Sequence, residues 1–257
     1  MKRKVLFDLH MHTHHSDGKS SVAEMADAAF AQNLNMGLSD HGPAHLYFGA
    51  KNANMEALFQ EIQAYQQAHP PQRILFGIEA NFIGHGKIDA DQIERPFDYI
   101  LAGYHKGIFP RHLLSPSLSL RSGFRSHRKS ILMTNEVIRV MDDPRIIAIT
   151  HPGEYIPIEM APLAEAAAEK GVLLEINERH PLYPYDLQIA AEKGAYFLLS
   201  TDSHHASRVG HFENSWDAIE RSGIDPARIV NTPYYAWDNP SLRIHALKGD
   251  ILREDIR

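Results

Sequence analysis

Histidine and carboxylate side chains occur in this sequence at spacings that suit metal binding. Asp8-Leu-His10-Met-His12 places two imidazoles two residues apart, and Asp202-Ser-His204 repeats that spacing with a carboxylate and an imidazole. In an extended segment, side chains at positions i and i+2 point the same way, so each pair can serve one ion or two adjacent ions. The chain has 17 His and no Cys, so any metal site must use His, Asp and Glu.

The candidate ligands share a second property, because each lies at or just after the end of a short apolar segment typical of a buried strand. They are His10, His12, Asp17, His41, Glu79, His105, His151, Asp202 and His204. One histidine at a strand end is usually structural, but seven strand ends that agree favour a common site. Nine ligands exceed the needs of one ion, and a bridging Glu79 would divide them among two or three. Imidazole and carboxylate suit zinc, manganese or iron.

Other polar residues near these motifs are interpreted as supporting groups. We expect Glu175 and Asn177 to support the ligands, and Asp8 and Asp40 to orient neighbouring histidines. Six histidines are surplus to the pattern and are interpreted as surface or substrate-facing: His14, His15, His45, His180, His205 and His211. His205 is also a candidate general acid, with water on a metal as the alternative.

The predicted elements bring the candidate ligands to one face. Apolar segments at residues 5–9, 35–39, 74–78, 99–102, 146–150, 172–176 and 196–200 alternate with helices. The helices are expected at 54–68, 126–141, 160–170, 185–193 and 212–222, after a first one opened by a capping box at Ser21 and Glu24. Gly171 and Gly194 stand where helices end. This alternation predicts one α/β domain over residues 1–257, a parallel (β/α) barrel of about seven units. A doubly wound open sheet is the alternative.

Composition excludes some classes of function. The 257 residues are 44% hydrophobic, which predicts a sizeable core, and a net charge of −6 disfavours duplex nucleic acid as the main partner. No apolar run has the length of a membrane span, and the run near the amino terminus is too short for a signal peptide. The expected location is the cytoplasm, without membrane contact, and the oligomeric state is left open.

With these residues in view, the chain resembles the PHP (polymerase and histidinol phosphatase) superfamily, and most closely its YcdX-type bacterial phosphatases. The matching motifs span residues 8–204 and include Asp8-Leu-His10-Met-His12, Ser39-Asp40-His41-Gly42, Gly77-Ile-Glu79, Thr150-His151-Pro152 and Thr201-Asp202-Ser-His204. The resemblance implies a distorted (β/α)7 barrel with a trinuclear site. It assigns His10, His12, Glu79 and Asp202 to a first ion, Glu79, His105 and His151 to a second, and Asp17, His41 and His204 to a third. Some close relatives have His where this chain has Asp17, which leaves the third metal open.

The expected function is metal-dependent hydrolysis of a small phosphomonoester, by attack of a metal-bound hydroxide without a covalent intermediate. Glu79 is the expected bridging catalytic residue. A phosphodiesterase or 3'-5' exonuclease acting on short oligonucleotides, and a histidinol-phosphate phosphatase, are alternatives. A non-enzymatic interaction module is disfavoured by the complete ligand set. Three basic residues are candidate contacts for the substrate phosphate: Arg121, Arg125 and Arg128.

Overall fold

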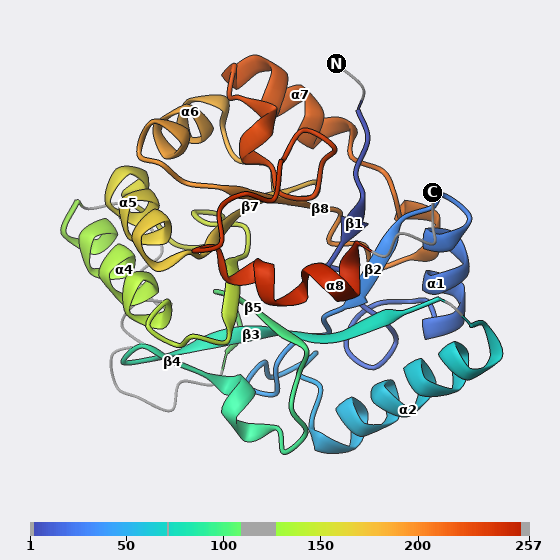
Figure 1. The fold of residues 1–257 in the computed structure, drawn as a ribbon. Coiled ribbons are helices and arrows are strands. Elements are labelled where there is room, and N and C mark those ends of the chain that lie inside the picture. The colour runs from blue at the N-terminus through green and yellow to red at the C-terminus, as the bar shows by residue number, and fades with distance from the viewer. Residues whose placement is uncertain (1–2, 71, 109–126, 253–257) are drawn as a thin grey trace.

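The computed structural model describes residues 3–70, 72–108 and 127–252, in which helices surround a ring of strands (Figure 1). The strands are β1 (Phe7–Asp8), β2 (Asn35–Leu38), β3 (Ile74–Gly84), β4 (Lys87–Ile88), β5 (Tyr99–Gly103), β6 (Ile146–Ile149), β7 (Leu173–Asn177) and β8 (Phe197–Ser200). The helices are α1 (Val22–Phe30), α2 (Asn52–Ala68), α4 (His127–Val140), α5 (Met160–Lys170), α6 (Pro184–Glu192), α7 (Glu213–Ser222) and α8 (Lys248–Ile251).

The strands form a nearly closed parallel barrel. Their order is β1-β2-β3-β5-β6-β7-β8, each parallel to its neighbour, while β4 forms an antiparallel hairpin with β3. A bridge between Met11 and Ser203 joins the chain just after β1 to the chain just after β8. The Asn231 amide spans the same seam and donates to the carbonyl oxygens of Phe7 at 2.7 Å and Leu199 at 2.6 Å. The predicted barrel is therefore confirmed, and the open doubly wound sheet is wrong.

The interior of the barrel is packed with side chains and depends on glycine at two positions. The buried Tyr99 points inward, and its hydroxyl donates to the carbonyl oxygen of Leu9 at 2.7 Å. A Cβ added at Gly37 would lie 2.3 Å from the Tyr99 hydroxyl oxygen, and one at Gly77 would lie 2.2 Å from its Cζ. Both distances are far inside van der Waals contact, so glycine at these positions makes room for the ring.

The carboxyl-terminal part of the chain fills the amino end of the barrel. In Figure 1, α8 lies across the middle of the ring of strands. Ile244 and Ile251 pack in the same core cluster as the inward-facing Tyr99. The side chain of Asn35, the first residue of β2, donates to the carbonyl oxygen of Ile251 at 2.8 Å. The opposite end of the barrel, at the carboxyl ends of the strands, is therefore the end that can hold a functional site.

Most predicted elements agree with the structure to within a residue or two at their ends. The capping box at Ser21 and Glu24 is confirmed, and Gly171 ends α5 in a left-handed conformation with φ 66°. Helix α4 begins at His127, the first described residue after the gap. The β4 hairpin and α8 were not predicted. Among the described residues, no helix combines the length and apolar character needed to cross a bilayer.

Candidate metal centre

All nine predicted ligands are described, and five of the histidines among them contact the carboxylate of Glu79. Glu79 is fully buried in β3. Its Oε1 lies 2.9 Å from Nε2 of His151 and 3.3 Å from Nε2 of His105. Its Oε2 lies 3.2 Å from Nε2 of His10 and 3.0 Å from Nδ1 of His41. Each carboxylate oxygen therefore faces imidazoles on its own side, which is the geometry that a bridging ligand needs.

A first group combines ligands from the ends of β1 and β8. The Nε2 atoms of His10 and His12 are 3.0 Å apart, and Nε2 of His12 is 3.3 Å from Oδ1 of Asp202. One ligand atom from each of the three residues lies within 4.8 Å of the others, and all three residues are buried. The i, i+2 spacing of the histidines thus aims both rings at one point, as the sequence predicts.

A second group lies on the opposite side of Glu79. The Nε2 atoms of His105, after β5, and His151, after β6, are 3.1 Å apart, and both face Oε1 of Glu79. His41 is close enough to share an ion with this group, because His41, Glu79 and His105 can each offer a ligand atom within 4.8 Å of the other two. His41 therefore lies between this group and the next.

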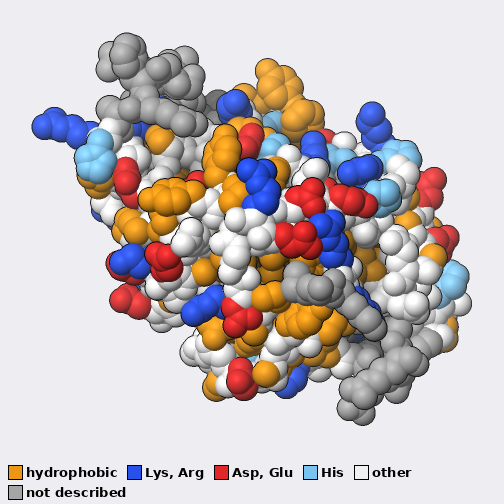
Figure 2. All heavy atoms as spheres, turned by 90° about the horizontal axis from the view of Figure 1, so that it is seen from above, with side chains coloured by type: hydrophobic (Ala, Val, Ile, Leu, Met, Phe, Trp, Pro, Cys, Tyr) orange, Lys and Arg blue, Asp and Glu red, His pale blue; other side chains and the backbone are white. Residues whose placement is uncertain are grey.

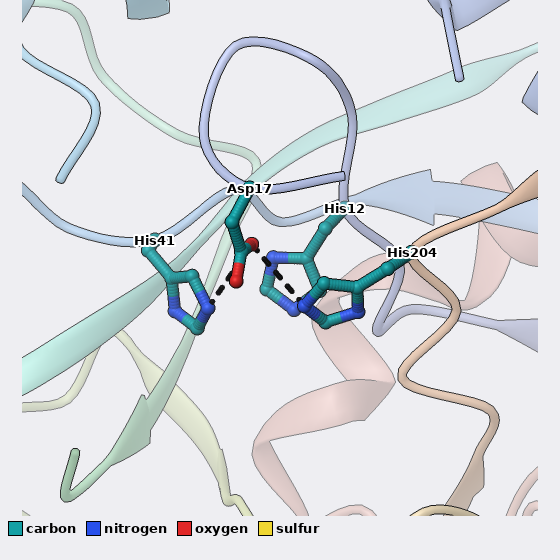
Figure 3. Close-up of side chains that lie close together, drawn as sticks. All are labelled: His12, Asp17, His41 and His204. Carbon is teal, nitrogen blue, oxygen red and sulfur yellow. Dashed lines mark ion pairs between the residues drawn. The ribbon is translucent and has the colours of Figure 1, made fainter. Parts of the chain in front are cut away.

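A third group is centred on Asp17, in the turn after β1. Figure 3 shows the Asp17 carboxylate between the rings of His41 and His204, with His12 beside them. Its Oδ1 is 3.4 Å from Nε2 of His41 and 3.1 Å from Nε2 of His204. The cluster thus contains three overlapping groups of ligand atoms, and His12 and His41 each belong to two of them.

Unpaired polar atoms inside the cluster fit bound cations. Nδ1 of His12 is buried without a hydrogen-bond partner among the described residues, and Nδ1 of His41 and Oε2 of Glu79 face each other at 3.0 Å without the geometry of a hydrogen bond. In two places a pair of imidazole nitrogens faces each other at about hydrogen-bond distance, where the two rings can share one proton at most. Buried polar atoms normally find partners, and a divalent ion would supply them here. The donor set of His, Asp and Glu fits zinc, manganese or iron.

The histidines of the cluster are of two kinds: in some the pKa is lowered, and in others it is raised. Burial and the neighbouring His204 and His41 lower the pKa of His12 to about 3. Burial would also lower the pKa of His41, but its contacts with Asp17 and Glu79 outweigh burial and raise it to about 10. Burial would raise the pKa of Glu79, but neighbouring histidines hold that pKa well below its usual range. Without ions, imidazolium groups therefore balance the buried carboxylates.

Two buried residues at the end of β7 support the cluster. Oε1 of Glu175 lies 2.5 Å from Nδ1 of His10, and its Oε2 accepts from the backbone N–H of His151 at 2.7 Å. The Asn177 amide donates to Glu175 at 3.0 Å and to Asp202 at 3.2 Å. Glu175 therefore fixes the ring of His10 so that its Nε2 faces the cluster, which is the supporting role predicted for it.

Asp8 and Asp40, which are predicted to orient neighbouring histidines, contact the backbone beside those histidines and not their rings. Asp8 accepts from the backbone N–H of His10 at 3.0 Å and from the Thr201 hydroxyl at 2.5 Å. Asp40 accepts from the backbone N–H of Thr13 at 2.7 Å and also from the Thr13 hydroxyl. These carboxylates hold the backbone of the ligand-bearing segments, because each lies beside a loop whose N–H groups need acceptors.

Two ligands adopt backbone conformations that are rare for residues other than glycine. His151 has φ 28° and Asp202 has φ 51°. Such a conformation costs about 1–3 kcal/mol and persists where the surrounding structure enforces it, often at functional sites. Both residues come two positions after the end of a strand, where the chain leaves the barrel.

A cavity of about 400 Å³ opens onto the cluster. Two basic side chains that the sequence analysis missed line it. Arg179 and Lys106 line it together with Tyr155 and His180. Nη1 of Arg179 is 3.3 Å from Oδ1 of Asp202, and its side chain is 48% exposed. Arg179 and Lys106 each follow a strand-end motif by one or two residues, so their positions could have identified them.

The predicted auxiliary residues are placed less favourably. His205 is exposed and caps a short 3-10 helix (Ala206–Arg208), and it is not among the residues that line the cavity. Its role as general acid stays a prediction. Arg128 is exposed in the first turn of α4, while Arg121 and Arg125 lie outside the described residues.

Sequence comparison shows the class of protein that this fold and cluster define. Residues 8–179 match the PHP domain, so the chain belongs to the PHP family. It is 30% identical to a protein named "Probable phosphatase" from Syntrophotalea carbinolica, over 89% of this chain and 92% of the relative. It is 28% identical to "Probable phosphatase YcdX" from Escherichia coli O81 (strain ED1a), over 87% and 89%. The predicted enzyme class, a phosphatase, is thereby confirmed.

A solved structure has the same fold. This structure is that of the provisionally named histidinol phosphatase hisK from Listeria monocytogenes, and the TM-score is 0.60. The match covers 82% of the present chain and 99% of the Listeria chain. The two sequences are only 13% identical, so this likeness concerns the fold alone.

Proposed function

We propose that this protein hydrolyses a small phosphomonoester at the cluster around Glu79, with the help of divalent metal ions. The observation that carries the proposal is a cavity lined by six of the nine predicted ligands together with Arg179 and Lys106. The six ligands are Asp17, His41, His105, His151, Asp202 and His204. A phosphate dianion needs neutralising charge on several oxygens, which ligated cations and a guanidinium together provide. The volume of about 400 Å³ suits a small metabolite.

In this proposal the chain holds two or three divalent transition-metal ions. The ligands would be His10, His12 and Asp202 with Glu79 for the first, Glu79, His105 and His151 for the second, and Asp17, His41 and His204 for the third. When bound, such ions supply activation of water at neutral pH and neutralise charge on the phosphoryl oxygens. No covalent intermediate with the protein is required.

The other residues of the cavity orient the substrate. Arg179 projects beside Asp202 and His204, where its planar guanidinium can bind two phosphoryl oxygens at once. The Tyr155 hydroxyl carries its proton at neutral pH and can donate to the phosphate or the leaving group, and burial raises its pKa further. His180 lies 3.4 Å from that hydroxyl and 3.3 Å from Glu154, which holds its ring at the edge of the cavity.

The alternatives differ from this proposal in what the cavity must contain. A phosphodiesterase or exonuclease needs a cationic or aromatic path for further nucleotides. In Figure 2, basic and acidic side chains are interspersed over the described part of the visible face, without a continuous basic stripe. Histidinol phosphate remains a candidate substrate, and an anion-binding role for Arg121, Arg125 and Arg128 remains a proposal.

Two measurements test the proposed function. Protein purified without chelator should contain two or three transition-metal ions per chain by elemental analysis. With manganese or zinc supplied, it should hydrolyse phosphomonoesters such as p-nitrophenyl phosphate or histidinol phosphate faster than bis(p-nitrophenyl) phosphate. Less than one ion per chain after reconstitution, or a preference for the diester, would contradict the proposal.

A further inference from the structure

A separate set of metal-type side chains lies between the turn after β1 and helix α2. His14 and His15 belong to that turn, and Glu61 projects from α2. Nε2 of His15 is 3.1 Å from Oε1 of Glu61, and Nε2 of His14 is 3.6 Å from the same oxygen. The two imidazole rings lie beside each other, with centroids 4.2 Å apart. Two rings thus converge on one carboxylate oxygen, and none of the three residues belongs to the ligand groups of the central cluster.

The distances fit the edges of a tetrahedral metal site. Zinc binds imidazole nitrogen and carboxylate oxygen at about 2.0–2.2 Å, so neighbouring ligand atoms of a tetrahedron are about 3.3–3.6 Å apart. The observed 3.1 Å and 3.6 Å lie at or close to this range, and one atom from each residue lies within 4.8 Å of the others. Small rotations of the side chains would close the remaining edge. Three protein ligands leave a fourth position for water.

The surrounding structure holds part of this arrangement in place. The His15 side chain is only 8% exposed. Its backbone N–H donates to the Thr13 hydroxyl at 3.2 Å, and its carbonyl accepts from the Asn54 side chain at 3.3 Å. His14 and Glu61, in contrast, are 46% and 42% exposed, so an ion can reach them from solvent. One fixed imidazole and two accessible partners form a partly organised site.

We propose that His14, His15 and Glu61 bind a further divalent ion of the zinc class, separate from the ions of the central cluster. The bound ion would tie the turn to α2. That turn also carries Asp17, so occupation of the outer site would restrict the segment that presents Asp17 to the cluster. The proposal does not depend on the phosphatase reaction, because it rests only on the geometry of these three residues.

Metal stoichiometry at controlled free zinc tests the proposal. Wild-type protein and the variants His14→Ala, His15→Ala and Glu61→Gln are dialysed against a series of zinc buffers, and bound zinc is measured by elemental analysis. At high free zinc, each variant should bind one zinc ion per chain less than wild type. The zinc ions that bind tightly in the central cluster should be unchanged in number. Thermal unfolding provides a second readout: zinc in the weak-binding range should raise the Tm of wild type and not that of the variants.

A matched control separates this site from general surface binding. His211 is also exposed and lies 3.9 Å from Glu213, but it has no third ligand in the described groups. His211→Ala should therefore bind as many zinc ions per chain as wild type. Unchanged stoichiometry in His14→Ala and Glu61→Gln, whose exposed side chains make misfolding improbable, would overturn the proposal. Loss of an equivalent from His211→Ala would overturn it as well, because binding would then be adventitious.

Discussion

Binding of zinc to the metal-free protein should release protons, because at least two of the predicted ligands, His10 and His41, are protonated when no ion is present. The pKa of His41 is raised to about 10, and that of His10 is raised well above its usual range by Glu79 and Glu175 against the effect of burial. An imidazolium cannot coordinate a metal, so each must lose its proton on binding. His12 and His105, with pKa values lowered to about 3 and about 4, are already neutral.

The sign and size of the effect follow from these values. Below pH 10 the proton on His41 competes with the metal, so zinc affinity should rise with pH and level off only above the pKa. At about pH 7.5 the distance to that pKa is roughly 2.5 units, a cost of about 3 kcal/mol to metal binding at His41. Each such proton contributes about a tenfold gain in affinity per pH unit.

Calorimetric titration of the metal-free protein with zinc, in buffers of different ionisation enthalpy, measures the protons released. We expect at least two per chain at about pH 7.5, from His10 and His41 with a contribution from His151, whose pKa Glu79 raises against the effect of burial, and about one fewer after His41→Asn. Release of less than one proton by wild type, or a value unaffected by His41→Asn, would refute the reasoning.

Further predictions concern activity and packing. Glu79→Gln keeps the shape of the bridging side chain but removes its charge, so kcat should fall by roughly three orders of magnitude while circular dichroism stays unchanged. Arg179→Ala should lower kcat/KM about tenfold or more through loss of a charged phosphate contact, and unchanged kinetics would exclude that contact. Excess chelator should abolish phosphatase activity, and zinc or manganese should restore it; full activity in chelator would contradict the metal-dependent mechanism. Gly77→Ala should cost about 1–3 kcal/mol in urea unfolding because its Cβ meets the Tyr99 ring, whereas Gly249→Ala, which meets nothing within 4 Å, should cost far less.

The placement of most ligands could be predicted from sequence because they lie near strand ends. Glu79, which lies inside β3, and Asp17, in the turn after β1, are the exceptions. His10 and His12 share a face by their spacing alone, and parallel strands that close into a barrel bring all such ends together. The partner of His15 could not be predicted in this way. Glu61 lies on a helix whose rotation and position depend on packing against the rest of the chain, and its own sequence neighbourhood contains no metal motif.

The limits of the fold prediction have a similar origin. The strand at 74–78 was recognised by its apolar run, but β3 continues to Gly84 because the chain pairs with Lys87–Ile88 in a hairpin. The short α8 has too few residues for a periodic pattern to be detected. Its position depends on long-range contacts such as that of Arg73 with Asp250, at 3.1 Å.

The seam between the first and last strands of the barrel has a consequence for the order of events during synthesis. His10 and His12 leave the ribosome early, whereas Asp202, which completes their group, emerges only after nearly the whole barrel has been made. An ion therefore cannot be held by the full group until β8 has docked beside β1. A bound ion would link two distant parts of the chain and stabilise the closed ring. Metal uptake by a growing chain would then mark the moment at which the barrel is completed.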